Sequence, residues 1–373
     1  MSFTDRRSPF DLAGTAKPDG RDVSGTSSFA YLGWDGRGNM GDDAIRLALE
    51  RALPSASFVS LPHSVGELGA FLAGPSRVAA RQAHLLMGGG TVIGRRNWRY
   101  LLTPNLWLTG GRPALMIGAG VEDPVFQGRH SFSSRGELGR WKSVLEQFDR
   151  VTVRGPRSAA LLAELGVDAP VVGDPALLLH APAGVEVQDD VIGVCLGFGS
   201  DLWSHGQDGV VEEVAGLVRR LVRQSGMRAR FYVLNVEDIR WSVQCAGSAG
   251  LGIGDYEIVL ADDPDRYLSS VASCAVLVGQ RLHAVILAFA AGVPSVMLEY
   301  QPKCRDFMES VDHPEWSFRT DRLVGGDLFE VIGGMREERE MLVGQIRQTI
   351  DRFRALLAEE VCRIGIVSGT TGA

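Results

Sequence analysis

One stretch of the sequence places an arginine and a histidine at the expected start of a helix. The apolar run at 275–278 leads into the sequence GQRLH at 279–283, and a helical pattern follows. Free N–H groups and the positive end of the helix dipole favour an anion there, so Arg281 would complete a phosphate or carboxylate site. His283 beside it can move protons near neutral pH. A core histidine bonded to a backbone carbonyl is the alternative, but it leaves the arginine unexplained.

Two further cations follow other expected strand ends. Arg154 directly follows the expected strand at 150–153, and its planar guanidinium fits a carboxylate or a phosphate. Lys303 follows the run at 295–298, after Tyr300, whose ring could stack on a sugar. A structural salt bridge for Arg154 and a solvated side chain for Lys303 are the alternatives.

A glycine-rich loop, GWDGRGNMGDD at 33–43, ends in an acidic pair. Its glycines permit sharp turns, and its Asn or Asp side chains can cap the helix that follows. Its spacing is not the G-x-G-x-x-G of a dinucleotide-binding loop. Two adjacent carboxylates are better suited to binding sugar hydroxyls, or to acting as a general base, than to binding a phosphate. The alternative is that they only cap the helix. The residues that we select from this loop are Gly36, Gly38, Asn39, Gly41, Asp42 and Asp43.

Two more loops follow apolar runs. Gly88, Gly89 and Gly90 allow the backbone to approach either a ligand or a neighbouring helix, and the sequence favours neither. Asp174, in the sequence GDPA, could orient a partner or end its strand as a turn residue.

The elements that position these loops form two series. Apolar runs alternate with helical patterns, which predicts βαβ units and parallel sheets. The polar segment 181–190 interrupts the alternation, and we interpret it as a linker. The first series has expected strands at 29–32, 57–61, 85–87, 114–117, 150–153 and 171–172. The second has expected strands at 192–196, 230–234, 257–260, 275–278 and 295–298.

We therefore predict an α/β protein of two Rossmann-like, doubly wound domains that face each other across a cleft. Residues 27–182 form the first domain and residues 190–326 the second. A stripe of apolar residues from Leu342 to Leu357 predicts a long C-terminal helix, 327–364. Ligands of such sheets bind beyond the carboxyl ends of the strands, where the selected loops lie.

The composition excludes several classes of protein. The chain has 373 residues and a net charge of −7, with no basic face for nucleic acid. Its five scattered cysteines form no CxxC pair, which argues against a structural zinc site and favours a reducing compartment. No apolar run reaches the roughly 20 residues of a membrane span. Residues 1–26 and 365–373 are expected to be flexible. The first of these segments has no signal-peptide pattern, and we expect the protein to be cytoplasmic.

The motifs together resemble a known family. The ordered set GWDGRGNMGDDA, GGGT, VRGPRS, GDPALL and GQRLHAVILAFAAGVPSVMLEYQPK is similar to the polysaccharide pyruvyl transferases, over roughly residues 30–310. The last block is the most specific of the five. The resemblance implies a GT-B-like fold and transfer of a pyruvyl group from phosphoenolpyruvate onto two hydroxyls of a sugar, which leaves a cyclic ketal. It implies phosphoenolpyruvate as a co-substrate, and no further cofactor or metal.

The resemblance also implies roles for individual residues. His283 would be catalytic, with Asp42 and Asp43 as base or as holders of the acceptor. Gly155 and Pro156 follow the arginine where an acidic residue is expected, which would alter how that arginine is held. The residues implied to bind phosphoenolpyruvate are Arg154, Gln280, Arg281 and Lys303.

The acceptor would be a sugar of a cell-wall polysaccharide, an exopolysaccharide or a glycolipid. If it is lipid-linked, the protein must meet the inner face of the membrane peripherally, for which the sequence shows no clear device. The tryptophans could equally belong to the core. The candidate acceptor contacts are Trp34, Arg95, Arg96, Trp98 and Tyr300.

Two other functions stay open. A glycosyltransferase with a nucleotide-sugar donor would share the fold and would need an acidic residue for the ribose, for which Glu299 is a candidate. A non-catalytic binding relative is the second, although such a protein has no reason to keep every selected cation and the histidine.

Overall fold

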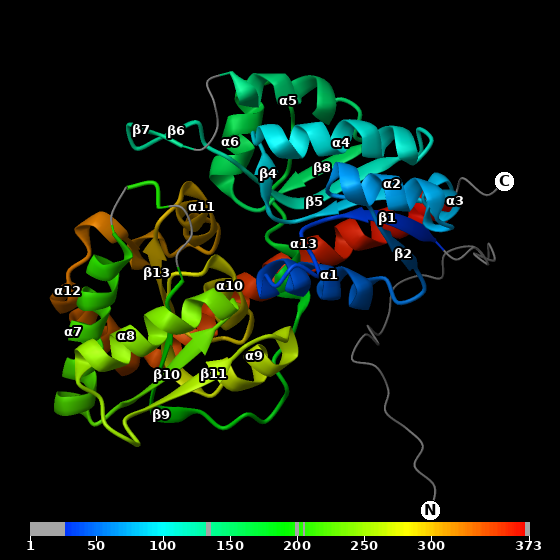
Figure 1. The fold of residues 1–373 in the computed structure, drawn as a ribbon. Coiled ribbons are helices and arrows are strands. Elements are labelled where there is room, and N and C mark those ends of the chain that lie inside the picture. Colours follow the sequence, from blue (N-terminus) through cyan, green and yellow to red (C-terminus); the bar gives the residue numbers. More distant parts are fainter. Residues whose placement is uncertain (1–26, 132–135, 198–200, 204–205, 370–373) are drawn as a thin grey trace, which may run out of the picture.

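The computed structural model describes residues 27–131, 136–197, 201–203 and 206–369 (Figure 1). Residues 1–26 and 370–373, parts of the segments that we expect to be flexible, lie outside the described residues. The described chain forms two α/β domains, each built on a parallel sheet with helices on both faces, as the sequence predicts (Figure 1).

The first sheet has the strand order β2-β1-β3-β5, and both β4 and β8 pair with β5. All its pairings are parallel. Its strands are β1 (Ser28–Leu32), β2 (Ser57–Ser60), β3 (His84–Gly88), β4 (Thr91–Ile93), β5 (Ala114–Val121) and β8 (Arg150–Val153). Its helices are α1 (Met40–Ala52), α2 (Val65–Ala73), α3 (Ser76–Arg81), α4 (Arg96–Leu108), α5 (Glu137–Leu145) and α6 (Pro156–Glu164).

The second sheet has the order β11-β10-β9-β12-β13-β14, again all parallel. Its strands are β9 (Gln188–Cys195), β10 (Arg228–Val233), β11 (Tyr256–Leu260), β12 (Cys274–Gly279), β13 (Ser295–Glu299) and β14 (Ser317–Arg319). Its helices are α7 (Gln207–Ser225), α8 (Ile239–Ala249), α9 (Pro264–Val271), α10 (Leu282–Ala290) and α11 (Pro302–Ser310).

The structure corrects several predicted elements. Residues 171–172 form only an isolated bridge, Val171 with Val153, and no strand. Strand β9 begins at Gln188, inside the predicted linker, and β4 and β14 were not predicted because they are only three residues long. The predicted helix 327–364 is two helices, α12 (Gly325–Glu337) and α13 (Arg339–Gly369), so helix continues into the predicted tail.

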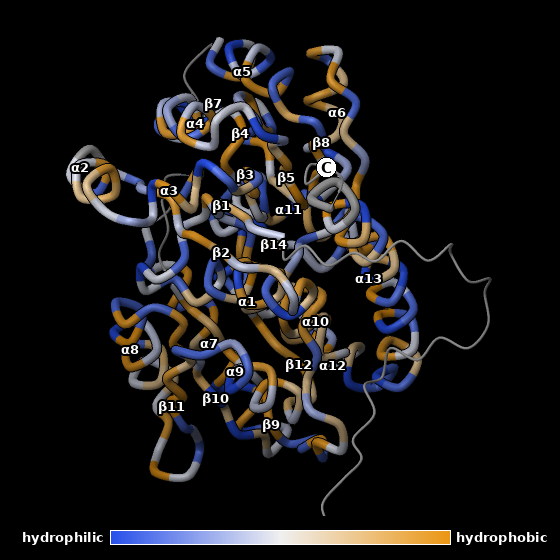
Figure 2. Tube along the Cα trace, turned by 90° about the vertical axis from the view of Figure 1, so that its right-hand side faces the viewer, coloured by the Kyte–Doolittle hydropathy of each residue, from blue (hydrophilic) through white to orange (hydrophobic). Residues whose placement is uncertain are grey.

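Helix α13 spans both domains. Near its start Arg339 donates to the carbonyl of Ala275 in the second domain. Towards its end Glu360 accepts two hydrogen bonds from Arg150 of β8 in the first domain. Its buried stripe, from Leu342 to Ile364, belongs to an apolar core that also includes residues of β1, α1 and α10. Figure 2 shows the hydrophilic side of α13 turned outward. This helix therefore holds the two domains in one arrangement.

A hairpin forms a second link between the domains. Strands β6 (Val125–Phe126) and β7 (Arg129–His130) extend from the first domain over the second (Figure 1). There the ring of Phe126 lies 5.8 Å from that of Trp203, and Arg129 donates to the Trp203 carbonyl.

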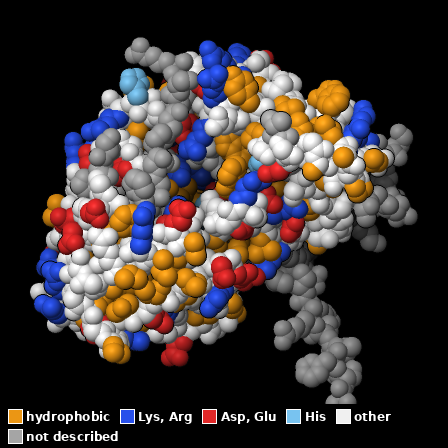
Figure 3. All heavy atoms as spheres, in the orientation of Figure 1, with side chains coloured by type: hydrophobic (Ala, Val, Ile, Leu, Met, Phe, Trp, Pro, Cys, Tyr) orange, Lys and Arg blue, Asp and Glu red, His pale blue; other side chains and the backbone are white. Residues whose placement is uncertain are grey.

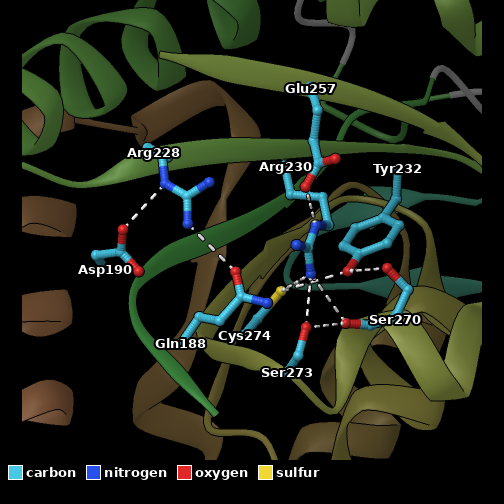
Figure 4. A network of polar contacts seen from close by, with 9 residues as sticks. All are labelled: Gln188, Asp190, Arg228, Arg230, Tyr232, Glu257, Ser270, Ser273 and Cys274. Atoms are coloured by element: carbon cyan, nitrogen blue, oxygen red, sulfur yellow. Dashed lines mark hydrogen bonds and ion pairs between the residues drawn. The ribbon is translucent and has the colours of Figure 1, made fainter. Parts of the chain in front are cut away.

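A charged network occupies the amino-terminal edge of the second sheet, away from the edge where ligands are expected (Figure 4). Arg230 is buried there and donates to Glu257 and to the hydroxyl of Ser273, while Arg228 pairs with Asp190. These contacts join the starts of β9, β10, β11 and β12, so this network has a structural role.

The described residues include neither a membrane-spanning helix nor a cluster of metal ligands. None of the helices is long and apolar enough to span a bilayer. Nor do any three His, Cys, Asp or Glu side chains in this part of the chain group in a way that could hold a metal ion.

Candidate functional site

The carboxyl ends of strands from both sheets meet at a cavity of about 90 Å³ between the domains. Parallel strands direct all their following loops to one edge, which is why loops far apart in sequence converge here. Basic side chains gather at the hollow between the domains in Figure 3. The cavity is lined by Asn39, Gly41, Asp42, Gly90, Thr91, Arg154, Leu234, Asn235, Arg281, Leu282, His283, Tyr300 and Lys303. We call it the inner cavity.

Arg281 is the residue that precedes α10, so it lies at the N-terminus of that helix as predicted. Its guanidinium makes a two-pronged ion pair with Asp238, with N–O distances of 2.6 and 2.8 Å. Asp238 follows strand β10 and was not selected from the sequence. Arg281 still lines the inner cavity, but its charge is shared with a carboxylate.

Asp174 lies between two of the selected side chains. Its Oδ2 is 3.5 Å from Nη1 of Arg154 and 3.7 Å from Nε2 of His283, while its Oδ1 accepts from the backbone of Ala176. Burial opposes ionisation, but the neighbouring His283 and Arg154 hold the pKa of Asp174 below its ordinary value. The prediction of a turn residue is confirmed by Oδ1, whereas Oδ2 lies near Arg154 and His283, where the predicted orienting role stays a prediction.

Arg154 is buried and extends along β5 towards the cavity. Its Nη2 donates to the hydroxyl of Thr91, at 3.2 Å, and its Nε has no partner among the described residues. A Cβ added at Gly120 would lie 2.6 Å from Nη2, so this glycine leaves room for the guanidinium.

His283 packs against the N-terminal turn of α1. A Cβ added at Gly41 would collide with Nδ1 of the imidazole, so only a glycine permits this contact. With Nε2 directed towards Asp174, Nδ1 is the nitrogen on the Gly41 side, and both residues line the inner cavity. A carboxylate on the side of one ring nitrogen orients the imidazole and leaves the other nitrogen for proton transfer.

The two aspartates in the first turn of α1, Asp42 and Asp43, have different surroundings. Asp42 lines the inner cavity, and Asn39, the N-cap of α1, donates to it. Burial raises the pKa of Asp42 to about 6, against the opposing charges of His283 and Lys303. Asp43 instead accepts from the backbone N–H of Gly36, at 2.6 Å, and does not line the cavity. The structure therefore gives Asp43 a loop-holding position rather than the predicted catalytic one.

The glycines of the two loops have different surroundings. A Cβ at Gly88 or Gly89 would collide with apolar side chains of α1, so these two serve helix packing. Gly90 has a φ of +71° and lines the inner cavity. Gly36 and Gly38 also have positive φ, and no atom lies near the position of an added Cβ, so they serve the turn itself.

Lys303 follows β13, in the first turn of α11, and lines the inner cavity. Its Nζ lies 5.0 Å from the ring centre of Tyr300 and makes no ion pair within the described part of the chain. Tyr300 is buried and lines the inner cavity but not the outer region of the cleft, so it does not have the position predicted for an acceptor contact.

A groove of about 560 Å³ adjoins the inner cavity, with which it shares Asn39, Asp42, Gly90, Thr91 and Lys303. We call it the outer groove. Trp34 and Trp98 line it, with their rings 6.2 Å apart in an edge-on arrangement, and His63 contacts both.

Two arginines also line the outer groove. Arg95 pairs with the buried Glu122 at 2.7 Å, whereas Arg96 is exposed. Of the predicted acceptor contacts, the structure thus brings Trp34, Trp98 and both arginines together.

Two residues that the sequence suggested as ligand contacts, Gln280 and Glu299, line neither the inner cavity nor the outer groove. Gln280 is fully buried, exchanges hydrogen bonds with Gln207 and accepts from Gly197, so it does not have the position of the predicted phosphoenolpyruvate ligand. Glu299 is buried against Arg305, at 2.7 Å, and is not the ribose-binding carboxylate that a nucleotide donor would need.

The sequence around Arg154 now has a physical explanation. A Cβ at Gly155 would collide with Asp306 of α11 in the second domain. Asp306 accepts from the backbone N–H groups of Arg157 and Ser158 and from the Ser158 hydroxyl, so it caps α6 across the domain interface. The acidic partners expected beside Arg154 are thus supplied by remote parts of the chain.

A larger hollow, of about 760 Å³, lies where α12 meets α13. It is lined by acidic and basic side chains together, Arg336 and Glu340 among them. None of the selected side chains lines it, so its size does not make it the candidate site.

Comparison with known proteins agrees with this geometry. Residues 39–302 match the family described as polysaccharide pyruvyl transferase. The chain belongs to this family. The amylovoran biosynthesis protein AmsJ of Erwinia amylovora is 26% identical over 102 residues, which are 27% of this chain and 25% of that protein. The chain thus matches about a quarter of the length of this relative.

Solved structures share the fold at low sequence identity. S. aureus MnaA, solved with UDP, has a TM-score of 0.58 and 13% identity over 90% of this chain and 94% of its own. The UDP-GlcNAc 2-epimerase from Neisseria meningitidis, solved with UDP-GlcNAc, has a TM-score of 0.56 and 10% identity over 91% of this chain and 100% of its own. The predicted GT-B-like fold is therefore confirmed.

Proposed function

We propose that the protein transfers the pyruvyl group of phosphoenolpyruvate onto two hydroxyls of one sugar and leaves a cyclic ketal. The observation that carries this proposal is the junction of two cavities of different character. The inner cavity holds three cations and a histidine, which suit a small molecule with a phosphate and a carboxylate. The adjoining outer groove has two tryptophans, which suit a sugar.

The reaction needs proton transfers and no redox step. Protonation of the methylene carbon of phosphoenolpyruvate makes a methyl group and leaves cation character on the central carbon. One sugar hydroxyl adds to that carbon, the bond from this carbon to the phosphate oxygen breaks, and the second hydroxyl closes the ketal. Of the two protons that the hydroxyls lose, one ends on the methyl group and one on the released phosphate.

Each side chain has a role in this scheme. Arg154, Arg281 and Lys303 bind the anionic groups of the donor, and His283 transfers a proton through Nδ1 while Asp174 holds Nε2. Asp42, at the junction of the two cavities, takes the proton of an attacking hydroxyl, for which a pKa of about 6 is suitable near neutral pH.

Lys303 offers the sharpest test of the donor site, because both arginines already face a carboxylate. We expect calorimetry to show phosphoenolpyruvate binding by the wild type and a loss of at least about tenfold in Lys303→Met, since a charged hydrogen bond contributes roughly 1.5–3 kcal/mol. Lys142→Met removes an exposed lysine on α5 and is the matched control.

UDP and GDP are titrated in the same experiment. Binding of a nucleotide in place of phosphoenolpyruvate would contradict the proposal and favour a nucleotide-sugar donor. If phosphoenolpyruvate binds only after a sugar is added, the donor assignment stands and the order of binding is defined. The absence of binding to either ligand, with and without acceptor sugars, would favour a non-catalytic relative.

A further inference from the structure

One region of the first domain differs in charge from the rest of the chain. Between Glu67 and Glu122 there are six arginines and no aspartate or glutamate, whereas the whole chain has a net charge of −7. The region includes the end of α2, all of α3 and α4, and β3 to β5. Its strands are buried, and its arginines lie on α3 and α4 and in the loops on either side of α4.

Apart from Ser76, Asn97 and Thr103, the exposed side chains of these helices are apolar, aromatic or basic. On α4, Arg96, Tyr100 and Trp107 recur at intervals of four and seven residues and so lie on one face; Tyr100 is 52% and Trp107 70% exposed. On α3, Val78 is 61% exposed and stands next to the exposed Arg77. Figure 3 shows hydrophobic and basic side chains over these helices.

The helices form one continuous surface. Helix α3 contacts both α2 and α4, and Arg112, just after α4, donates to the carbonyl of Arg81 at the end of α3. Between α2 and α3 lies a hollow of about 420 Å³, lined by Leu72, Arg77, Val78 and Arg81 among others. Figure 2 shows α2 standing out from the body of the protein. We call this surface the α2–α4 face.

Much of the positive charge on the α2–α4 face is not neutralised. Arg95 and Arg99 pair with Glu122 and Glu137, which lie outside the acid-free stretch. The other four arginines make no ion pair with any described residue; they are Arg77, Arg81, Arg96 and Arg112.

We propose that the α2–α4 face binds the surface of an anionic lipid bilayer. Unpaired arginines attract anionic headgroups, and each contributes on the order of fivefold to the partitioning. Exposed tryptophan and tyrosine rings favour the boundary between headgroups and hydrocarbon. Valine and leucine side chains between the cations add apolar contact with the outer ends of the acyl chains.

Charge separates this face from another exposed apolar region. In the second domain Val236, Val243 and Ile253 are exposed around α8. That region also carries Glu237, Asp255, Glu257, Asp262 and Asp263, which would repel an anionic bilayer. The α2–α4 face, in contrast, combines exposed apolar side chains with unpaired positive charge, and its one carboxylate, Glu67 at the start of α2, is paired with Arg37.

The position of the face also gives it a use. Arg96 and Trp98 in the first turn of α4 line the outer groove, and the exposed side of the same helix belongs to the α2–α4 face. A bilayer bound there would bring a lipid-linked sugar beside the groove. This second step rests on the proposed function, whereas binding to the bilayer does not.

The test is co-sedimentation of the full chain with phosphatidylcholine vesicles, with and without phosphatidylglycerol. We expect binding to the anionic vesicles, much weaker binding to the neutral ones, and release by added salt. Arg77→Glu combined with Arg81→Glu should weaken partitioning at least tenfold, and Trp107→Ala should weaken it without changing its salt dependence. The double variant Arg223→Glu/Arg240→Glu is the matched control, because these exposed arginines of α7 and α8 make no ion pair with any residue that the structure describes.

Failure of this inference can be told apart from failure of the proposed function. Phosphoenolpyruvate binding and transfer to a soluble sugar should be the same in the double variant Arg77→Glu/Arg81→Glu as in the wild type, which also shows that the variant is folded. No binding to anionic vesicles, equal binding to neutral ones, or equal loss in the control variant would each overturn the membrane inference and leave the catalytic proposal in place.

Discussion

Asp174 illustrates how residues in this site depend on one another. The carboxylate has no exposed surface, and it uses one oxygen for its own turn and the other for Arg154 and His283. A 3.7 Å separation from Nε2 is longer than a hydrogen bond, so a small movement on ligand binding would complete that contact. Proton transfer and anion binding therefore share one buried charge.

Replacing the histidine should separate these two functions. We expect His283→Ala to lower kcat by roughly 10²–10⁴-fold, the usual contribution of a general acid or base, while phosphoenolpyruvate binding stays within a few-fold. The measurement is steady-state transfer together with calorimetry. A variant that keeps kcat within threefold of the wild type would end the assignment of His283 as proton carrier.

Asp42 should affect stability and rate in opposite directions. Its folded-state pKa of about 6 lies above the unfolded value, so ionisation of the carboxyl costs stability as the pH rises through about 6. Asp42→Asn removes that cost and should raise the free energy of unfolding by about 2 kcal/mol near pH 8, with little gain near pH 4. Denaturant unfolding at both pH values measures this.

The same variant should lose the rise in kcat with pH that the wild type shows near pH 6. If Asp42→Asn keeps that rise, another group is the base and Asp42 only holds the acceptor.

At the scale of elements, the first turn of α1 and the first turn of α10 are packed against each other. Gly41 allows the imidazole of His283 to lie directly against the α1 backbone, and the same turn presents Asp42 and Asn39 to the cavity. Two helix N-termini from different domains thus face one small volume, which favours an anionic ligand.

Gly41→Ala tests this contact between helices. Alanine is the better helix former, but its Cβ would displace the imidazole, so we expect at least about a tenfold loss of kcat with little change in melting temperature. Gly216→Ala, in α7 where an added Cβ meets nothing within 4 Å, is the control and should keep full activity. Equal activity of both variants would show that the position of the His283 ring is not critical.

At the scale of the whole molecule, links between the domains keep the two halves of the site in register. Asp306 caps α6 from the opposite domain, Arg157 pairs with Glu309 at 2.7 Å, and α13 crosses both domains. Burial raises the pKa of Asp306, and its hydrogen bonds to α6 oppose that shift. The start of α6, which Asp306 caps, directly follows Arg154. A change in the angle between the domains would therefore move this donor-binding arginine.

Asp306→Ala should therefore act at a distance. Loss of the cap should cost about 1–2 kcal/mol of unfolding free energy and lower kcat/KM, because Arg154 and Lys303 lie on opposite sides of the interface. Glu309→Ala removes only the partly exposed ion pair and should cost less than about 1 kcal/mol. Chemical denaturation and transfer assays on both variants make the comparison; equal effects would show that the cap has no special role.

Much of the site could be predicted because it depends on local sequence. Each selected loop follows an apolar strand, and parallel strands bring their following loops to one edge, so Arg154, Arg281, His283 and Lys303 meet as expected. Short elements were missed because three residues, as in β4, carry too little periodicity to recognise. Asp238 was missed because the loop after β10 has no glycine-rich pattern.

The sequence alone determined the two series of strands and helices and the edge at which the chemistry lies. Only the tertiary structure decided which of two neighbours faces the cavity: Asp42 and not Asp43, and Arg281 and not Gln280. Adjacent residues near a helix start point in directions about 100° apart, so this choice depends on how the helix is docked. The partners that tune the charges, such as Asp306, come from remote segments, and the sequence does not pair them.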